Sequence, residues 1–289
     1  MNPIDILYKI VPESTFRNLR NLYYVGIKAA YPPLSKDRFV HLLTDRLGVR
    51  KGMVVYVHSS LDKLNLKFSA YQLLETMQEI VGHKGTLLFP CWQYVGRAED
   101  YINSDGYRNF NVRTSTTTMG LLPELVRRHK DSYRSLHPTS SVVAIGHDAE
   151  EMIKEHHKDI YPNGEFSPLY KLNQYDSRII GLGEKVVSLS YVHVVEDIMK
   201  EDFPIQTLGN APVTLNSVDS TGRNHEIQTL LPHSNIGARN TPEYCKKHIS
   251  QDICRTISYC GSNYFSAVPI TLLAEMKKLA MDGKTIYSI

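Results

Sequence analysis

The stretch Met53-Val-Val-Tyr-Val57 is a continuous apolar run, rich in valine, that is typical of a strand buried on both faces of a parallel sheet. It opens into His58-Ser-Ser-Leu61. A helix is expected over residues 71–81, and Thr86-Leu-Leu-Phe89 is predicted to form the next strand. Strand, loop, helix and strand in this order indicate a βαβ unit, whose functional loops follow the carboxyl ends of the strands. Residues 58–60 and 91–94 hold such positions, so both segments are expected beside a site.

Further elements are predicted on both sides of this unit. A helix capped by Ser35 and closed by Gly48 precedes it. Strands are expected at 142–145 and 178–182, helices at 119–129, 148–157, 192–199, 241–250 and 270–281, and a hairpin within 204–228. The chain is therefore predicted to be an α/β protein, with a central, mostly parallel sheet flanked by helices and a β-containing C-terminal part.

Residues 1–34 form a helical N-terminal extension in this interpretation. Ser14 can cap a helix that continues to Ala30 and ends before Pro32-Pro33. Because aromatic and basic residues are interleaved along it, the helix is expected to pack on the body with a basic outer face. Residues 35–289 then form a single domain.

The composition is that of an ordinary globular protein. Of the 289 residues, 42% are hydrophobic and 22% are charged, which is ample for a sizeable core. The net charge is only +3 and the basic residues are scattered, which argues against a nucleic-acid binder but leaves room for a local patch that receives phosphates. No apolar run of about 18 residues occurs, so no insertion into a membrane is expected.

The chain shows no sign of an exported protein. Its beginning, Met1-Asn-Pro-Ile-Asp5, lacks the basic and apolar regions of a secretory signal. The cysteines at positions 91, 245, 254 and 260 show no paired C-x-x-C spacing. Reduced thiols in a cytoplasmic protein are the simplest interpretation. The oligomeric state stays open, with a homodimer as one option.

His193 and Glu196 form the most informative polar pair. Val192, Val195 and Met199 recur at helical spacing, and positions i and i+3 of a helix share one face. A carboxylate bonded to one ring nitrogen fixes the histidine tautomer and leaves the other nitrogen to take a proton, as a general base requires. An isolated His-x-x-Glu is also compatible with an incidental ion pair on a surface helix.

Other signatures of catalysis are missing from the sequence. It has no G-x-x-x-x-G-K-[ST], no G-x-G-x-x-G after a strand and no G-x-S-x-G, so a P-loop, a dinucleotide fingerprint and a nucleophile elbow are not supported. His156 and His157 follow Glu155, but adjacent side chains on a helix point apart and H-E-x-x-H is missing. No metal is therefore expected, and a zinc hydrolase is a distant alternative.

Six motifs occur in a fixed order between about residues 35 and 280. They are Gly48-Val-Arg-Lys-Gly-Met-Val-Val-Tyr-Val-His-Ser-Ser-Leu61, Gly85-Thr-Leu-Leu-Phe-Pro90, Met119-Gly-Leu-Leu-Pro-Glu124, Arg134-Ser-Leu-His-Pro-Thr-Ser-Ser141, Gly164-Glu-Phe-Ser-Pro-Leu169 and His193-x-x-Glu196. Together they resemble the antibiotic acetyltransferase family, whose best-known members are aminoglycoside 3-N-acetyltransferases. The resemblance implies a non-GNAT α/β fold and transfer of an acyl group from coenzyme A to an amine, without a metal. Residues 1–34 fall outside it.

The resemblance also implies roles for individual residues. His193 is the general base and Glu196 orients it. Coenzyme A lies along three loops, and the backbone N–H groups of residues 58–60 face the oxyanion. The coenzyme residues are His58, Ser59, Ser60, Leu61, Met119, Gly120, Ser140 and Ser141. The substrate side is assigned to Trp92, Glu165, Phe166 and Lys185.

The net charge bears on the identity of the amine acceptor. Aminoglycosides are polycations whose sites are expected to be lined with carboxylates, whereas this chain carries a net charge of +3. An amino sugar linked to a nucleotide diphosphate, in a glycan or antigen pathway, is therefore the favoured acceptor. The alternative is an aminoglycoside 3-N-acetyltransferase that confers antibiotic resistance. A non-catalytic binding protein on the same fold is more distant.

Overall fold

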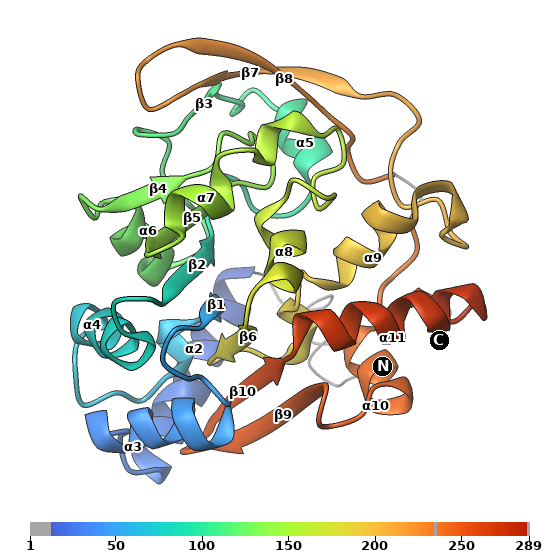
Figure 1. Cartoon of the computed structure of the whole chain (residues 1–289). Helices are drawn as coiled ribbons and strands as arrows, with labels where there is room; N and C mark the ends of the chain where they lie inside the picture. Colours follow the sequence, from blue (N-terminus) through green and yellow to red (C-terminus); the bar gives the residue numbers. More distant parts are fainter. Residues whose placement is uncertain (1–12, 234–235, 288–289) are drawn as a thin grey trace.

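A β-sheet forms the centre of the molecule (Figure 1). The computed structural model describes residues 13–233 and 236–287, and within them seven strands pair in the order β4-β5-β2-β1-β6-β10-β9. Their bounds are β1 Val54–Ser59, β2 Thr86–Pro90, β4 Ser132–Arg134, β5 Val142–Gly146, β6 Ser177–Leu182, β9 Cys254–Tyr259 and β10 Ser262–Ala267. The run that starts at Met53 thus supplies the middle strand, β1.

Three neighbouring strands, β2, β1 and β6, run parallel. The α/β class and the βαβ unit of β1 and β2 are confirmed. The sheet is mixed rather than mostly parallel, however, because β5 pairs antiparallel with β2 and β10 pairs antiparallel with β6. The connections β4–β5 (residues 135–141) and β9–β10 (residues 260–261) are too short for a parallel crossover, which needs a dozen or more residues. Both hairpins therefore add antiparallel edges.

Helices cover both faces of the sheet. Alternate side chains of β1 divide between two cores, with Val55 and Val57 in one and Val54 and Tyr56 in the other. The first core is covered by α3 Lys36–His41 and its π-helical continuation Leu42–Arg46, by α4 Ala70–Val81 and by α6 Leu121–Arg127. The second is covered by α7 Ala149–Ile153, α8 Pro168–Lys171, α9 Val192–Met199, α10 Thr241–His248 and α11 Pro269–Met281. The β1 strand is therefore buried on both sides, as its apolar sequence predicts.

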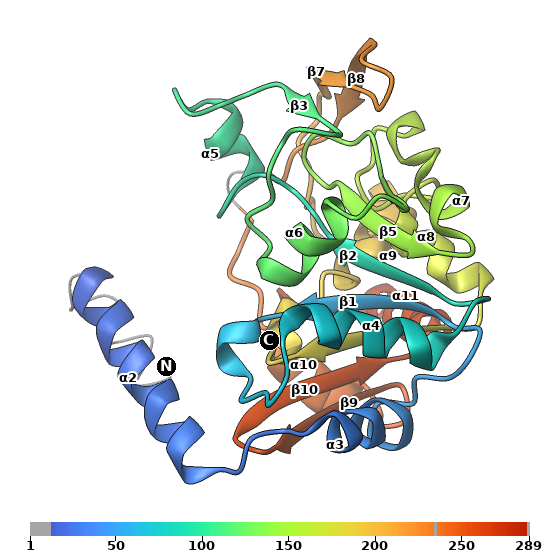
Figure 2. The same ribbon diagram turned by 90° about the vertical axis from the view of Figure 1, so that its left-hand side faces the viewer.

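A smaller sheet lies with α5 (Ala98–Ile102) at one end of the molecule (Figures 1 and 2). It consists of β3 Phe110–Asn111, β7 Val213–Val218 and β8 Asn224–Thr229. The β7–β8 pair confirms the hairpin predicted within 204–228, and its turn is closed by Gly222 N, which donates to Asp219 O at 3.1 Å. The chain that leaves β8 returns to the main body.

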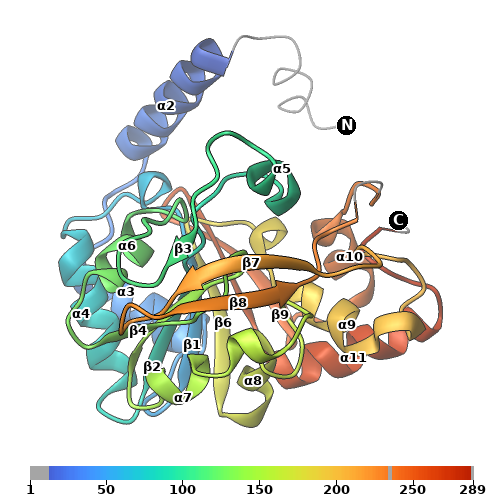
Figure 3. The same ribbon diagram turned by 90° about the horizontal axis from the view of Figure 1, so that it is seen from above.

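The N-terminal helix α2 (Glu13–Ala30) stands away from the rest of the molecule (Figures 2 and 3). A helix was predicted here, but it does not pack along the body as expected. Contact is made near its end, where Ile27 and Tyr31 lie against Gly261. Residues 1–12 of the predicted extension lie outside the described part. Within residues 13–233 and 236–287, every helix is too short or too polar to cross a bilayer.

Gly181 of β6 lies between His58 of β1 and Phe265 of β10, its partners in the two ladders. A Cβ at residue 181 would lie 2.1 Å from Phe265 Cε1. We expect Gly181→Ala to lower the free energy of unfolding by about 1–3 kcal/mol, because the ring must shift within a close-packed core. Urea unfolding measures this loss. The loss should shrink in a Phe265→Leu background, and equal losses in both backgrounds would contradict the overlap.

Candidate active site

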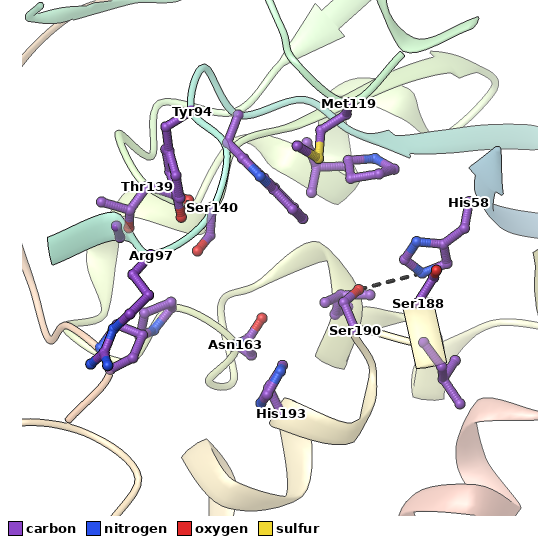
Figure 4. Close-up of a pocket in the computed structure, with 18 of the residues that line it drawn as sticks. His58, Tyr94, Arg97, Met119, Thr139, Ser140, Asn163, Ser188, Ser190 and His193 are labelled. Atoms are coloured by element: carbon purple, nitrogen blue, oxygen red, sulfur yellow. Dashed lines mark hydrogen bonds between the residues drawn. The ribbon is translucent and has the colours of Figure 1, made fainter. Parts of the chain in front are cut away.

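A cavity of about 1050 Å³ opens beside the carboxyl ends of the central strands (Figure 4). Its wall includes His58 from β1, Pro90 from the end of β2, Gly120 at the start of α6 and His193 near the start of α9. Small-molecule sites commonly enclose about 300–1,000 Å³, so this cavity lies at the upper end of that range. Its position at the strand ends is the one that the βαβ unit predicts.

His193 and Glu196 contact each other in the wall of this cavity. His193 Nδ1 lies 3.0 Å from Glu196 Oε2, and the exposed fractions of the two side chains are 25% and 4%. The hydroxyl of Tyr287 donates to Glu196 Oε1 at 3.0 Å. The carboxylate is therefore buried with a partner on each oxygen, while the imidazole reaches the cavity (Figure 4).

The second ring nitrogen of His193 accepts a hydrogen bond from Arg239 Nη1 at 2.6 Å. A guanidinium can only donate. Nε2 therefore presents its lone pair, and Nδ1 carries the proton that Glu196 accepts. The hydrogen-bond network thus assigns the tautomer in which Nε2 can take a proton.

The helix α9 is anchored through its apolar face. Val192 and Val195 are buried in the same cluster as residues of α11. His193, Glu196 and Asp197 share a different face of this amphipathic helix and all line the cavity. The sequence pattern that builds the helix therefore also turns its polar side toward the site.

His58, Ser188 and Ser190 lie together on one side of the cavity, with Ser190 near His193 (Figure 4). Ser190 Oγ lies 3.4 Å from His58 Nε2. Burial lowers the pKa of His58 to about 4, so its ring is neutral near pH 7. The Ser59 hydroxyl is buried and has no hydrogen-bond partner within the described part of the chain. This side of the cavity therefore presents neutral hydrogen-bonding groups.

Glu184 connects the loop after β1 to the loop before α9. Its Oε1 accepts from Ser60 and, at 3.0 Å, from Lys63 Nζ. Its Oε2 accepts from Ser188 Oγ at 2.5 Å. Burial acts to raise the pKa of Glu184, but the two hydroxyls and the ammonium outweigh it and the pKa is lowered. The ionised carboxylate accepts hydrogen bonds from these donors and so holds the loop after β1 against the loop before α9.

Asp197 is a buried carboxyl group in the cavity wall. Its Oδ2 accepts hydrogen bonds from the backbone N–H of Asn163 at 2.6 Å and from Asn163 Nδ2 at 3.1 Å. Burial, and next the neighbouring Glu196 carboxylate, raise the pKa of Asp197 to about 7. These bonds hold the loop before α8 against α9, which places Asn163 at the cavity (Figure 4).

We expect Asp197 to make stability depend on pH. Its folded pKa of about 7 exceeds the usual 3.8, so between these values the folded state binds more protons than the unfolded state. The free energy of unfolding therefore falls as pH rises from about 4 to about 7. Asp197→Asn should remove this contribution and gain stability relative to the wild type across that window. Urea unfolding at pH 5 and pH 8 measures the difference, and equal differences at both would contradict the expectation.

Most residues expected at the site line this cavity. Besides His193 and Glu196 they are His58, Ser59, Ser60, Leu61, Trp92, Met119, Gly120 and Ser140. Ser141 does not line it, because its buried hydroxyl donates to Cys91 O at 2.7 Å and links the ends of β5 and β2. Glu165, Phe166 and Lys185 are exposed and also lie outside the cavity wall.

The expected oxyanion donors also need a correction. The N–H of Ser60 donates to Leu182 O at 2.9 Å, because the pairing of β1 with β6 continues to the end of both strands. It is therefore not available to a ligand. The N–H groups of Gly120 and Leu121 open the first turn of α6, where a helix leaves its donors without intrahelical partners.

Several residues of the cavity wall were not expected from the sequence. They are Arg97, Asn163, Asp197, Arg239 and Tyr287. Asn163 directly precedes one of the quoted motifs, which is a usable signal. Arg239 and Tyr287 carry no such signal, since they reach the site from segments 46 and 91 residues away from their partners.

Within the described ranges, no three His, Cys, Asp or Glu side chains come together as a candidate metal site. His156 uses both of its ring nitrogens inside the protein. Nδ1 lies 2.9 Å from Ser135 Oγ, and Nε2 lies 2.9 Å from Pro162 O. Burial lowers the pKa of His156 to about 4, so it is a neutral, structural histidine.

Comparison with known proteins places this geometry in context. A family model described as aminoglycoside 3-N-acetyltransferase matches residues 56–257. Aminoglycoside N(3)-acetyltransferase IX of Micromonospora chalcea is 29% identical over 187 residues, which cover 57% of this chain and 62% of that protein. The aminoglycoside N(3')-acetyltransferase-like protein YokD of Bacillus subtilis is 30% identical over 165 residues, which cover 52% and 60%. The chain thus spans about three fifths of the length of these relatives.

Solved structures share the fold over most of the chain. Aminoglycoside acetyltransferase AAC(3)-Xa superposes with a TM-score of 0.72 at 20% identity, covering 92% of this chain and 98% of that one. The complex of AAC-IIIb with CoASH superposes with a TM-score of 0.71 at 18% identity, covering 88% and 99%. At these identities the likeness establishes the fold.

Proposed function

Because the chain belongs to the aminoglycoside 3-N-acetyltransferase family, we propose that it transfers an acyl group from the thioester of coenzyme A to the amine of an amino sugar. The observation that carries this proposal is the His193–Glu196 pair, 3.0 Å apart, in the wall of a cavity of about 1050 Å³. A base with an oriented lone pair and room for two substrates are the ingredients that the reaction needs.

His193 has the central role in the proposed mechanism. The amine attacks the carbonyl carbon of the thioester, the C–S bond breaks and the thiolate leaves. His193 Nε2 takes the proton that the amine loses and can return it to the thiolate, while Glu196 stabilises the imidazolium through Nδ1. A base of this kind contributes about 10²–10⁴-fold. No covalent enzyme intermediate is required, so transfer is direct within a ternary complex.

The coenzyme is proposed to lie along the hydroxyl-rich part of the wall. This part consists of His58, Ser59, Ser60, Leu61, Met119, Gly120 and Ser140. Gly120 has a φ of +105° and brings no side chain into the wall, so the first turn of α6 can approach a ligand closely. Trp92 is left for the substrate side.

An aminoglycoside is the acceptor that the comparisons favour. The family model and the quoted relatives are all described as aminoglycoside N-acetyltransferases or as similar to them. This support goes to the aminoglycoside rather than to the nucleotide-linked amino sugar that the net charge of +3 favours. Acetylation would neutralise one ammonium group of the drug, which is the chemical basis of resistance by modification.

One observation favours an anionic amino sugar as a second candidate. Arg97 and Arg239 both line the cavity, and Arg97 Nη2 also lies 3.4 Å from Glu99 Oε2 and donates to His233 O at 2.8 Å. Three of its four carboxyl groups, Glu184, Glu196 and Asp197, are occupied by hydrogen bonds within the protein, and the fourth, Asp62, is exposed. Two guanidinium groups in the wall attract a phosphate or carboxylate and repel a polycation. An amino sugar linked to a nucleotide diphosphate fits that charge pattern.

A direct comparison of acceptors tests the proposal. The protein is incubated with acetyl-coenzyme A and either an aminoglycoside or a nucleotide-linked 4-amino sugar, and the products are identified by mass spectrometry. An N-acetylated aminoglycoside is the expected product. Acetylation of the nucleotide-linked sugar alone would select the second candidate. The proposed function would be contradicted if this protein bound the coenzyme but acylated neither of these amines nor any other amine in a wider panel.

A further inference from the structure

The lone pair of the proposed base is already occupied within the protein. Arg239 Nη1 lies 2.6 Å from His193 Nε2, the nitrogen that must take a proton from the acceptor. A guanidinium stays protonated throughout the physiological pH range, so it cannot pass a proton to the ring. The contact therefore transfers no proton to the ring, and it occupies the lone pair of His193 Nε2.

Arg239 and the reacting amine compete for one position. A general base must lie within about 2.6–3.2 Å of the atom from which it takes a proton. Arg239 Nη1 already lies 2.6 Å from Nε2, at the place that the amine nitrogen would have to take. Nδ1 offers no second position, since it is bonded to Glu196 Oε2 at 3.0 Å. Arg239 must therefore leave before an amine can react.

The segment that carries Arg239 is built so that this side chain can leave. On one side His233 N donates to Thr207 O at 2.8 Å, and Arg97 Nη2 donates to His233 O at 2.8 Å. On the other side Asn240 N donates to Ile286 O at 2.7 Å. Residues 236–239 between these anchors belong to no helix or strand, and the Arg239 side chain is exposed. It can swing away without breaking β8 or α10.

Residues 236–239 are also part of the cavity that contains the base. Ile236, Gly237, Ala238 and Arg239 line the cavity, so they form part of the wall beside His193. We propose that Arg239 is a positioning residue that caps His193 until the acceptor amine displaces it. The cap holds the ring in its reactive tautomer and denies Nε2 to water. This inference rests on the proposed acyl transfer and adds a means of suppressing the competing hydrolysis.

Hydrolysis is the side reaction that the cap would prevent. Water attacks the thioester carbonyl, His193 Nε2 takes a proton from it, the C–S bond breaks and the thiolate receives the proton. The products are a carboxylic acid and coenzyme A, and no further reactant is needed. With Arg239 on Nε2, a water molecule has no base to accept its proton.

The test measures thiol release from acetyl-coenzyme A in the absence of any amine. We expect Arg239→Ala and Arg239→Met, the latter of similar length, to raise this release on the order of tenfold, because part of the base effect of about 10²–10⁴ becomes available to water. Arg239→Lys retains a cationic donor and should stay near the wild-type rate. Lys246→Ala removes an exposed cation of α10 outside the cavity wall and is the matched control.

A second substitution assigns the extra hydrolysis to the base. His193→Ala introduced into Arg239→Ala should return thiol release to the level of His193→Ala alone. Unchanged or lower release in both the alanine and the methionine variants would overturn the cap. Because this assay contains no acceptor, it is separable from the function itself, which fails if the wild type binds acetyl-coenzyme A but acylates no amine.

Discussion

Replacing His193 by alanine is expected to lower kcat by roughly 10²–10⁴-fold, because no general base then accepts the proton of the attacking amine. Coenzyme A should still bind, because none of the residues proposed to contact it belongs to α9. Steady-state thiol release with acceptor gives kcat, and calorimetric titration gives the affinity for the coenzyme. His83→Ala, at an exposed histidine outside the cavity wall, is the control and should keep its activity. Unchanged turnover in His193→Ala would dismiss the assignment.

The Glu196→Gln variant should lose activity nearly as severely. A glutamine amide can donate to Nδ1, which moves the ring proton to Nε2 and removes the lone pair from the amine. Where a carboxylate that orients a catalytic histidine is replaced by its amide, the loss reaches about 10⁴-fold. We therefore expect a loss of roughly 10²–10⁴-fold in kcat, measured by thiol release with saturating coenzyme and acceptor.

Tyr287→Phe provides the graded comparison for that prediction. It removes the hydroxyl that donates to Glu196 Oε1 at 3.0 Å but keeps the bond from Nδ1 to Oε2. We expect a loss of about tenfold or less, because the carboxylate keeps its charge and its contact with the ring. If Glu196→Gln retained the activity of Tyr287→Phe, Glu196 would not be the residue that orients the base.

The central strand, β1, could be predicted because its signal lies within a few consecutive residues. The valine-rich run at β1 is apolar at every position, and only a strand covered on both faces buries all of them. The β9–β10 hairpin was missed because Arg255 to Tyr259 is a half-exposed edge segment with no long apolar run. The antiparallel pairing of β5 with β2 was missed for another reason, since a continuous apolar run such as Val142–Gly146 predicts a buried strand but not its direction.

The residues of the candidate site differ in the same way, because only some of them are marked by a local sequence pattern. His193 and Glu196 could be found because a helix places i and i+3 on one face whatever the rest of the chain does. A loop has no such periodicity, so the sequence could not show that Lys185 faces solvent outside the cavity wall while its neighbour Glu184 lines it. Arg239 reaches the dyad only through tertiary packing, which no local spacing encodes.

Simultaneous measurement of both products in one reaction tests the central claim most directly. Thiol release from acetyl-coenzyme A and the amount of N-acetylated acceptor are followed together, with the wild type and with His193→Ala. The account predicts one thiol for each acetylated amine in the wild type and the loss of both signals in the variant. Acetylated amine formed at the wild-type rate by His193→Ala would contradict it.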